Sequence, residues 1–262
     1  MEYKDLIVEK AEGILTITLN RPQALNSFSD EVYAGLNTLM DQASEDAEVR
    51  AVIVTGAGRG FCAGVDFGVL DRMMDQSTAD FRREIVWIQQ SLFKMERLEK
   101  PVIAAINGAA AGGGFELALV CDLRIASTEA RLGFTEVRIG IIPDMGGTKR
   151  LSRVVGYGVA KELIMTGRFL SADEALRLGI LSAVVPPNEL LPRAKDLARE
   201  LMANAPMAVG LAKRVIDLGF DADMNTAFQF EVYAQSILHG SEDLREGVRA
   251  FREKRAPRFQ GR

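Results

Sequence analysis

A glycine-rich stretch that leads into a glutamate is the part of this sequence best suited to chemistry. Gly112, Gly113 and Gly114 follow the apolar run 102–106 and precede Glu116. Glycine has no Cβ, so the backbone can approach a ligand closely here. The first amides of the helix expected to follow lack intrahelical partners, and Glu116 falls within its first turn. Backbone N–H donors beside a carboxylate suit a reaction in which an oxyanion forms while a proton moves.

The other reactive residue types limit which chemistry is expected. The cysteines are Cys62 and Cys121, without a CxxC pair, and His239 is the sole histidine. A metal site, a disulfide framework and a Ser-His-Asp hydrolase are therefore not expected. The stretch 56–61 superficially resembles a dinucleotide loop, but Phe61 stands where its last glycine would be needed. Proton transfer must then fall to carboxylates, lysine, tyrosine or cysteine.

Composition indicates a globular protein with a sizeable core. The chain has 262 residues, of which 48% are hydrophobic and 26% charged, with a formal net charge of −4. This length suits one large domain or a domain with an extension. The acidic balance argues against nucleic acid as a partner, and no apolar run has the length of a membrane span. Residues 1–9 resemble a strand rather than a signal or transit peptide, so we expect a cytoplasmic location.

The periodicity predicts an α/β core and a helical C-terminal extension. Short apolar or alternating runs predict strands, and apolar residues at a 3.6-residue period predict helices between them. The expected strands cover 1–9, 15–19, 51–55, 102–106, 123–126 and 181–185. From residue 189 onward every periodic segment is helical, at 190–203, 208–218, 226–238 and 243–254. We therefore expect a core over residues 1–195 and a helical region over 196–262.

Several segments in the same order resemble the crotonase family, the enoyl-CoA hydratase/isomerase superfamily. They are Arg59–Asp66, Gly112–Asp122, Phe134–Leu151, the opening Leu19–Asn26 and the closing Glu246–Arg255. The resemblance runs from about residue 5 to the end. It implies a spiral of ββα units with a helical C-terminal trimerisation region, assembled as a trimer or a dimer of trimers. It also implies an acyl-CoA thioester as the substrate, with coenzyme A as part of that substrate and no permanently bound cofactor or metal.

The resemblance assigns the catalytic groups by motif position. The backbone amides of Val65 and Gly113 would hold the oxygen of a thioester enolate. Glu116 and Glu136 would hold a water over the enoyl double bond, with Glu116 as the base and Glu136 as the acid. The implied activity is hydration of a 2-enoyl-CoA to a 3-hydroxyacyl-CoA.

Asp144 keeps a second activity open. It lies eight residues after Glu136, where dienoyl-CoA isomerases of this family carry an acidic catalytic residue. Those isomerases have aspartate at the position of Glu116, which favours hydration here. The alternative is an enoyl-CoA or dienoyl-CoA isomerase that uses Glu136 and Asp144. A remote alternative is RNA binding, known for one member of the family, which the charge balance of this chain supports little.

Further residues are expected to contact the substrate or its coenzyme A portion. By resemblance, Lys254 would reach the 3′-phosphate of CoA in the site of a neighbouring subunit, with Phe251 packing near the nucleotide. Arg21 and Arg59 are further candidates for the negative charges of CoA, because the chain as a whole is acidic. The acyl chain length and the metabolic pathway stay open. The remaining residues expected to line the site are Leu25, Ala63, Gly64, Asp66 and Gly112.

Overall fold

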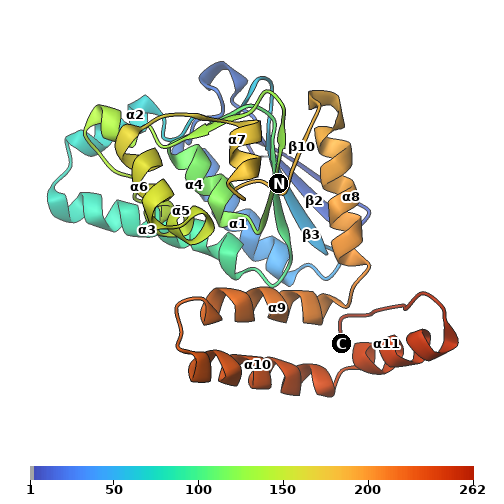
Figure 1. Ribbon diagram of the computed structural model, residues 1–262. Helices are drawn as coiled ribbons and strands as arrows, with labels where there is room; N and C mark the ends of the chain where they lie inside the picture. Colours follow the sequence, from blue (N-terminus) through green and yellow to red (C-terminus); the bar gives the residue numbers. More distant parts are fainter. Residues whose placement is uncertain (1–2) are drawn as a thin grey trace.

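The computed structural model describes residues 3–262 and contains two β-sheets surrounded by helices (Figure 1). The larger sheet has six strands in the order β1-β2-β3-β5-β7-β10, all parallel except β1, which pairs antiparallel with β2. This mixture of parallel strands and helices confirms the predicted α/β class. The strands are β1 Leu6–Ala11, β2 Ile14–Leu19, β3 Ala51–Gly56, β5 Val102–Ile106, β7 Leu123–Ser127 and β10 Ala183–Val185.

A second, smaller sheet lies directly beside the glycine-rich stretch. Its order is β4-β6-β8-β9, with β8 and β9 antiparallel and the other pairs parallel. The sequence patterns did not predict it, because its strands are too short to show a period. They are β4 Gly60–Cys62, β6 Ala109–Ala111, β8 Arg131–Gly133 and β9 Leu170–Ser171.

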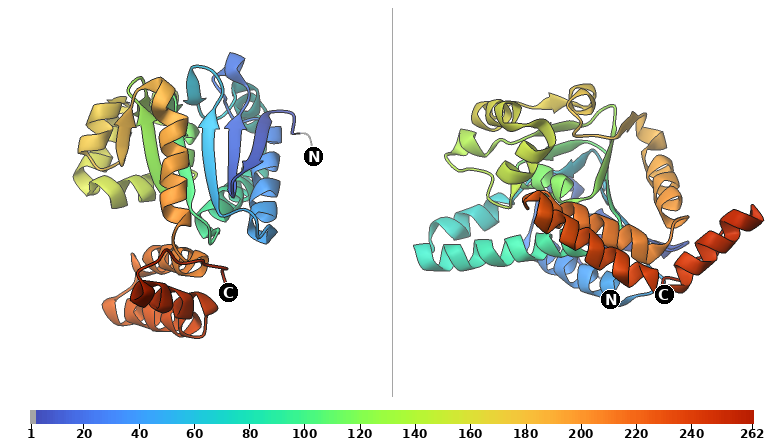
Figure 2. Two further views of the ribbon diagram at one scale, coloured as in Figure 1. Left: turned by 90° about the vertical axis from the view of Figure 1, so that its right-hand side faces the viewer. Right: turned by 60° about the horizontal axis from the view of Figure 1, so that its bottom comes forward.

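Most helices cover one face of the large sheet, and α8 covers the other (Figures 1 and 2). Short 3₁₀ turns occupy Pro22–Ala24, Glu136–Ile139 and Pro187–Glu189. The α-helices before the extension are α1 Asp30–Glu45, α2 Phe67–Met74, α3 Thr78–Arg97, α4 Gly113–Val120, α5 Gly147–Val155, α6 Tyr157–Thr166, α7 Ala172–Arg177 and α8 Leu190–Met202.

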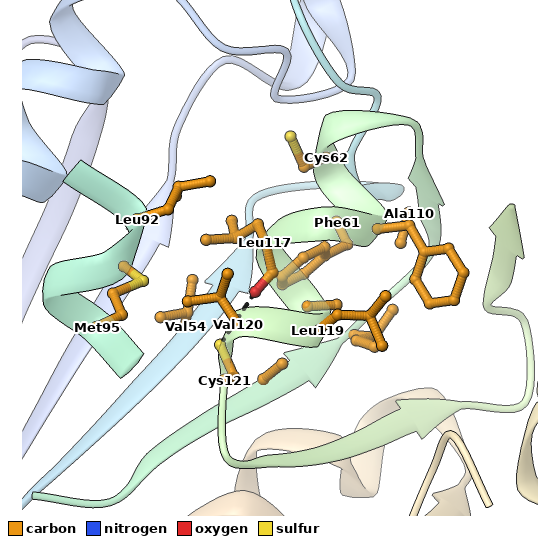
Figure 3. Close-up of a cluster of buried hydrophobic side chains, with 14 of the residues drawn as sticks. Val54, Phe61, Cys62, Leu92, Met95, Ala110, Leu117, Leu119, Val120 and Cys121 are labelled. Carbon is orange, nitrogen blue, oxygen red and sulfur yellow. Dashed lines mark hydrogen bonds between the residues drawn. The ribbon is translucent and has the colours of Figure 1, made fainter. Parts of the chain in front are cut away.

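Alternation along the central strands divides the core into two layers. In β3, Val52 and Val54 face the cluster that contains α1, α3 and α4, whereas Ile53 faces the layer under α8. Side chains of a strand point alternately to opposite faces, so a strand covered on both faces is apolar throughout. Figure 3 shows α4 in the larger layer, where Leu117 and Val120 lie among side chains of β3, β4 and α3. The start of α4 is thereby fixed by its buried side chains.

The chain leaves the large sheet after α8 and continues as α9 Pro206–Gly219, α10 Met224–His239 and α11 Glu242–Glu253. Helix α9 is attached to the core, since Lys213 Nζ lies 2.9 Å from the Asp122 carboxylate and donates to the Met95 carbonyl at 3.0 Å. Helix α10 runs beside α9 and buries none of its side chains (Figure 2). The predicted boundary at residue 195 falls inside α8, so our division into core and extension stays a proposal.

Candidate active site

The first turn of α4 lies against the segment 62–65. A Cβ built on Gly114 would lie 2.0 Å from the Cys62 carbonyl oxygen, and one on Gly64 would lie 2.9 Å from the Ala111 carbonyl oxygen and 3.2 Å from the Gly113 nitrogen. Contacts this close leave no room for a side chain at either position. Gly112 has φ +53° and ψ −126°, a conformation that glycine tolerates best. The glycines are therefore required by the close approach of two backbone segments.

Two backbone amides meet at this junction. Phe28 pairs with Val65 through the Gly64 carbonyl at 2.8 Å and the Asp66 amide at 3.1 Å, so the N–H of Val65 points away from Phe28. Gly113 is the first residue of α4, and the N–H of a first helical residue has no intrahelical acceptor. Within residues 3–262, neither N–H donates to a backbone carbonyl. Both remain available to an oxygen atom of a ligand.

Glu116 is held inside the protein by two backbone donors. Glu116 is only 1% exposed. Its Oε1 accepts hydrogen bonds from the backbone amides of Met145 at 2.8 Å and Gly147 at 2.7 Å. A Cβ on Gly147 would lie 2.8 Å from that same oxygen. Burial, and next the negative charges of Glu136 and Asp144, raise the pKa of Glu116 to about 8, although the two amides act in the opposite direction.

Glu136 lies on the other side of the glycine-rich turn. It begins the 3₁₀ turn 136–139, and its Oε1 lies 3.2 Å from where a Cβ on Gly112 would be. Both carboxyl oxygens are buried, and within the described residues neither accepts a hydrogen bond. Burial, followed by the charge of Asp144, raises the pKa of Glu136 to about 7, although the backbone amides of Glu136 and Thr135 act in the opposite direction. An unpaired buried carboxyl is costly to a fold, which is typical of groups retained for function.

Asp144 is the third acidic group of this region. Burial raises its pKa, and its charge raises the pKa of both Glu116 and Glu136. Its backbone carbonyl accepts a hydrogen bond from Gln89 of α3 at 2.5 Å. Burial raises the pKa of all three carboxyl groups, and the charge of Asp144 adds to the shift of both glutamates, so the site retains protons near neutral pH.

The residues expected to line the substrate path divide into two groups. Leu25, in the left-handed conformation with φ +49°, accepts a hydrogen bond from the Ala63 amide at 3.0 Å, so these two residues lie together beside Gly64. The Asp66 carboxylate caps α2 by accepting from Gly68 and pairs with Arg21 at 2.9 Å. Arg21 also pairs with Asp5 at 3.4 Å. Both Asp66 and Arg21 are thus engaged within the protein.

Phe251 and Lys254 lie at the end of α11, a helix that is remote from α4 of the same chain (Figure 1). The Phe251 side chain is 86% exposed, and Lys254 is exposed as the left-handed cap of the helix. Arg59 is exposed at the end of the turn that precedes β4. The structure of one chain therefore brings the glutamates and amides together, whereas Phe251 and Lys254 lie on the C-terminal extension.

Sequence reasoning missed the groups that hold Glu116. Met145 and Gly147 act through backbone amides, which no residue type reveals, and Arg150 supports them from α5. Tyr33, buried 112 residues away in sequence, donates from its hydroxyl to the Met145 sulfur at 3.6 Å. The pair Gly146-Gly147 was the available signal, because Gly146 has φ +94°.

Other kinds of chemistry find less support in the structure. Burial raises the pKa of both Cys62 and Cys121 to about 12, so neither supplies a thiolate near neutral pH. Among residues 3–262, no three His, Cys, Asp or Glu side chains are grouped to hold a metal ion. In the same part of the chain, no helix combines the length and apolar character needed to cross a membrane.

The sequence and the structure of this chain are similar to those of known proteins. The family model described as enoyl-CoA hydratase/isomerase matches residues 9–262. A short-chain-enoyl-CoA hydratase from Clostridium acetobutylicum is 44% identical over 97% of both chains, and a crotonyl-CoA hydratase from Syntrophomonas wolfei is 39% identical over 99% of both. The crystal structure of an enoyl-CoA hydratase from Bacillus anthracis is similar with a TM-score of 0.93 and 42% identity, covering 99% of this chain and 100% of that one.

Proposed function

Because the chain belongs to the enoyl-CoA hydratase/isomerase family, whose crotonase fold it shares, we propose that it adds water across the double bond of a 2-enoyl-CoA thioester. The product is the corresponding 3-hydroxyacyl-CoA. The observation that carries this proposal is the pair of buried carboxyl groups, Glu116 and Glu136, on either side of the glycine-rich turn. Two carboxyl groups near available amide donors provide an acid, a base and an oxyanion site without further groups.

In the proposed reaction the amides of Val65 and Gly113 bind the thioester oxygen. Glu116 takes a proton from water, whose oxygen forms a bond to C3, and the double-bond electrons move to give an enolate at the thioester oxygen. Glu136 then donates a proton to C2, and the enolate returns to a thioester. One oxyanion donor contributes about 2.7–4 kcal/mol to such a transition state in other enzymes.

The active form in this proposal carries one proton on the pair, because the base must be ionised and the acid protonated. The two amide bonds to Glu116 stabilise its carboxylate, whereas the unpaired oxygens of Glu136 favour a protonated group. Deeper burial of Glu116 acts in the opposite direction and raises its pKa further than that of Glu136. The assignment of base and acid therefore rests on the hydrogen bonds, and a single shared proton satisfies both pKa shifts.

Substitution of each glutamate tests the roles of the pair. Glu116→Gln and Glu136→Gln should each lower hydration of crotonyl-CoA by roughly 10²–10⁴-fold, since each removes one general acid–base group. Loss of the enoyl absorbance measures turnover, and Glu129→Gln, an exposed glutamate of the same core, is the matched control. Near-normal turnover by either site variant would contradict its assigned role.

Asp144 supports isomerisation as the second candidate, because its carboxyl interacts with both glutamates. Isomerisation moves a proton from one carbon to another and incorporates no water. Incubation with enoyl-CoA in ¹⁸O-labelled water distinguishes the two reactions. Oxygen label at C3 marks hydration, and a double bond retained at a new position marks isomerisation.

The names of the two relatives favour a short acyl chain as the substrate here. Coenzyme A would enter as part of that substrate, with no other cofactor. Self-association as a trimer or a dimer of trimers is supported by the exposed apolar side chains of α9 and α10, among them Ile216, Leu218, Phe228 and Val232. In such an assembly Phe251 and Lys254 would serve the site of a neighbouring copy. A cytoplasmic location stays a prediction.

A further inference from the structure

The segment 144–147 holds Glu116 through its backbone, and other side chains hold this segment in turn. Both bonds to Glu116 Oε1 come from this segment, one from the Met145 amide and one from the Gly147 amide. A backbone segment can fix a carboxylate only if its own position is fixed. The groups that bind its carbonyl oxygens therefore bear on the geometry of Glu116.

Arg150 is the strongest of these groups. It is buried on α5, and its Nη1 donates to the Met145 carbonyl at 2.8 Å. Its Nε and Nη2 donate to the two carboxylate oxygens of Glu96 on α3 at 3.1 and 2.7 Å. The guanidinium also lies 5.3 Å over the Phe93 ring. A planar fork engaged on three sides has little freedom, so Arg150 ties the Met145 carbonyl rigidly to α3.

Helix α3 holds the same segment at the preceding carbonyl. Gln89 Nε2 donates to the Asp144 carbonyl at 2.5 Å. Directly after these two attachments, Gly146 leaves space for the guanidinium, since a Cβ there would lie 2.1 Å from Arg150 Nη1. The carbonyls of Asp144 and Met145 thus accept from Gln89 and Arg150. The amides of Met145 and Gly147 donate to Glu116.

We propose that Arg150, anchored by Glu96, is a positioning residue that sets the orientation and protonation of Glu116 through the Met145 carbonyl. This inference rests on the proposed function for its kinetic consequence. Arg150 does not touch Glu116, so it acts only through the segment between them. Release of that segment would weaken the two amide bonds that stabilise the Glu116 carboxylate.

The consequence for Glu116 has a definite sign. Burial and the charges of Glu136 and Asp144 act against ionisation of this carboxyl, and the two amides act in favour of it. Of these, only the amides lower the pKa of Glu116. Their loss would therefore raise that pKa and favour the form in which Glu116, rather than Glu136, holds the proton. That form cannot deprotonate water, so turnover should fall with little effect on substrate binding.

Variants of the two anchoring residues test this inference. Arg150→Lys keeps the charge but cannot donate to the Met145 carbonyl and to both Glu96 oxygens at once. Glu96→Gln, half-buried, removes the charge of the anchor and serves as the second variant. Arg153→Lys is the matched control, because Arg153 also lies on α5, pairs with Asp221 and lies 4.9 Å over the Phe220 ring.

We expect Arg150→Lys to lower kcat for crotonyl-CoA by about 10- to 100-fold, with KM within about two-fold of wild type. Glu96→Gln should give a smaller loss in kcat. In infrared difference titrations against Glu116→Gln, the Glu116 carboxyl should titrate at higher pH in Arg150→Lys than in wild type. Arg153→Lys should match wild type in both measurements.

A folded Arg150→Lys with wild-type kcat and an unchanged Glu116 titration would overturn the inference. An equal loss in Arg153→Lys would also overturn it, because the effect would then be a general one of α5. If the wild type hydrated no enoyl thioester, the proposed function would fail. The infrared titration would still decide the positioning role, since it needs no turnover.

Discussion

At the scale of single residues, Glu136 is a buried carboxyl group whose ionisation is unfavourable in the folded protein. Its carboxyl oxygens are buried without hydrogen bonds, and its pKa of about 7 lies above the ordinary value of 4.5. In the unfolded chain the group therefore ionises at lower pH than in the folded protein. Below pH 4.5 both states are protonated and ionisation has no effect. As pH rises from there to about 7, folding loses stability, because only the unfolded state readily ionises.

Glu136→Gln should consequently stabilise the protein at high pH. At pH 8 we expect the free energy of unfolding to rise by about 1–3 kcal/mol relative to wild type. At pH 4 the difference should disappear, since the wild-type carboxyl is then neutral in both states. Urea unfolding followed by circular dichroism at the two pH values measures this. A stabilisation that is equal at pH 4 and pH 8 would show that packing, not ionisation, is responsible.

Residue types explain which parts of the candidate site could be predicted from the sequence. Glu116 was noticed because a carboxylate in the first turn of a glycine-initiated helix is a pattern of residue types. Its two hydrogen-bond donors are amides of Met145 and Gly147, about thirty residues later in the chain, and an amide leaves no trace in the sequence. Tyr33 was missed because a tyrosine at a helical period predicts core packing, and only the fold brings it to Met145.

At the scale of elements, the position of α4 depends on Gly114. A Cβ there would lie 2.0 Å from the Cys62 carbonyl oxygen, an atom of β4 that cannot rotate away. Gly114→Ala should therefore lower the free energy of unfolding by about 2 kcal/mol or more, because α4 and β4 must separate. Turnover should fall as well, since Gly113 moves with α4. Thermal unfolding and crotonyl-CoA hydration check the two effects.

Gly158 provides the matched control for that substitution. It lies within α6, its φ is not in the left-handed region, and an added Cβ would meet no atom within 4 Å. Alanine in an exposed helix position is favoured over glycine by about 0.5–1 kcal/mol. Gly158→Ala should therefore be neutral or stabilising. If Gly114→Ala were equally well tolerated, the contact between α4 and β4 would not control the fold.

Element lengths explain which parts of the fold could be predicted. The strands of the large sheet have three to six residues, and β2, β3 and β5 are long enough for alternation or a continuous apolar run to show. β4, β6, β8 and β9 have two or three residues, so no period exists to detect. The sequence patterns also did not predict helix α5, because it starts at glycine without a side-chain cap. These short elements are the ones that surround the site.

At the scale of the whole molecule, the C-terminal extension exposes more apolar surface than a single chain should. Helix α10 buries none of its residues, and Phe228, Val232, Tyr233 and Ile237 are all more than half exposed. Several large apolar side chains exposed along one helix face of a folded chain mark an interaction surface. We propose self-association through α10, which would give this face a partner and would bring the exposed Phe251 and Lys254 of α11 to another copy.

A charge placed on this face should separate the copies. Val232 is 59% exposed, so Val232→Asp should leave the chain folded while it puts a carboxylate into an apolar contact. Analytical ultracentrifugation should show a lower molecular mass than for wild type. Leu191→Asp is the control, because Leu191 is also an exposed apolar residue and lies on α8, outside the extension. An unchanged mass for Val232→Asp would exclude this face of α10 from the assembly.

Kinetics of the dissociated variant then tests whether one chain contains the whole site. Glu116, Glu136 and both amide donors belong to the core of one chain, so the chemical groups should survive dissociation. If Phe251 and Lys254 bind coenzyme A for a neighbouring copy, Val232→Asp should raise KM for crotonyl-CoA, and Lys254→Ala should raise it in the assembled enzyme. The two effects should not add in the double variant, because dissociation already removes Lys254 from the site. Additive effects would place Lys254 in the site of its own chain.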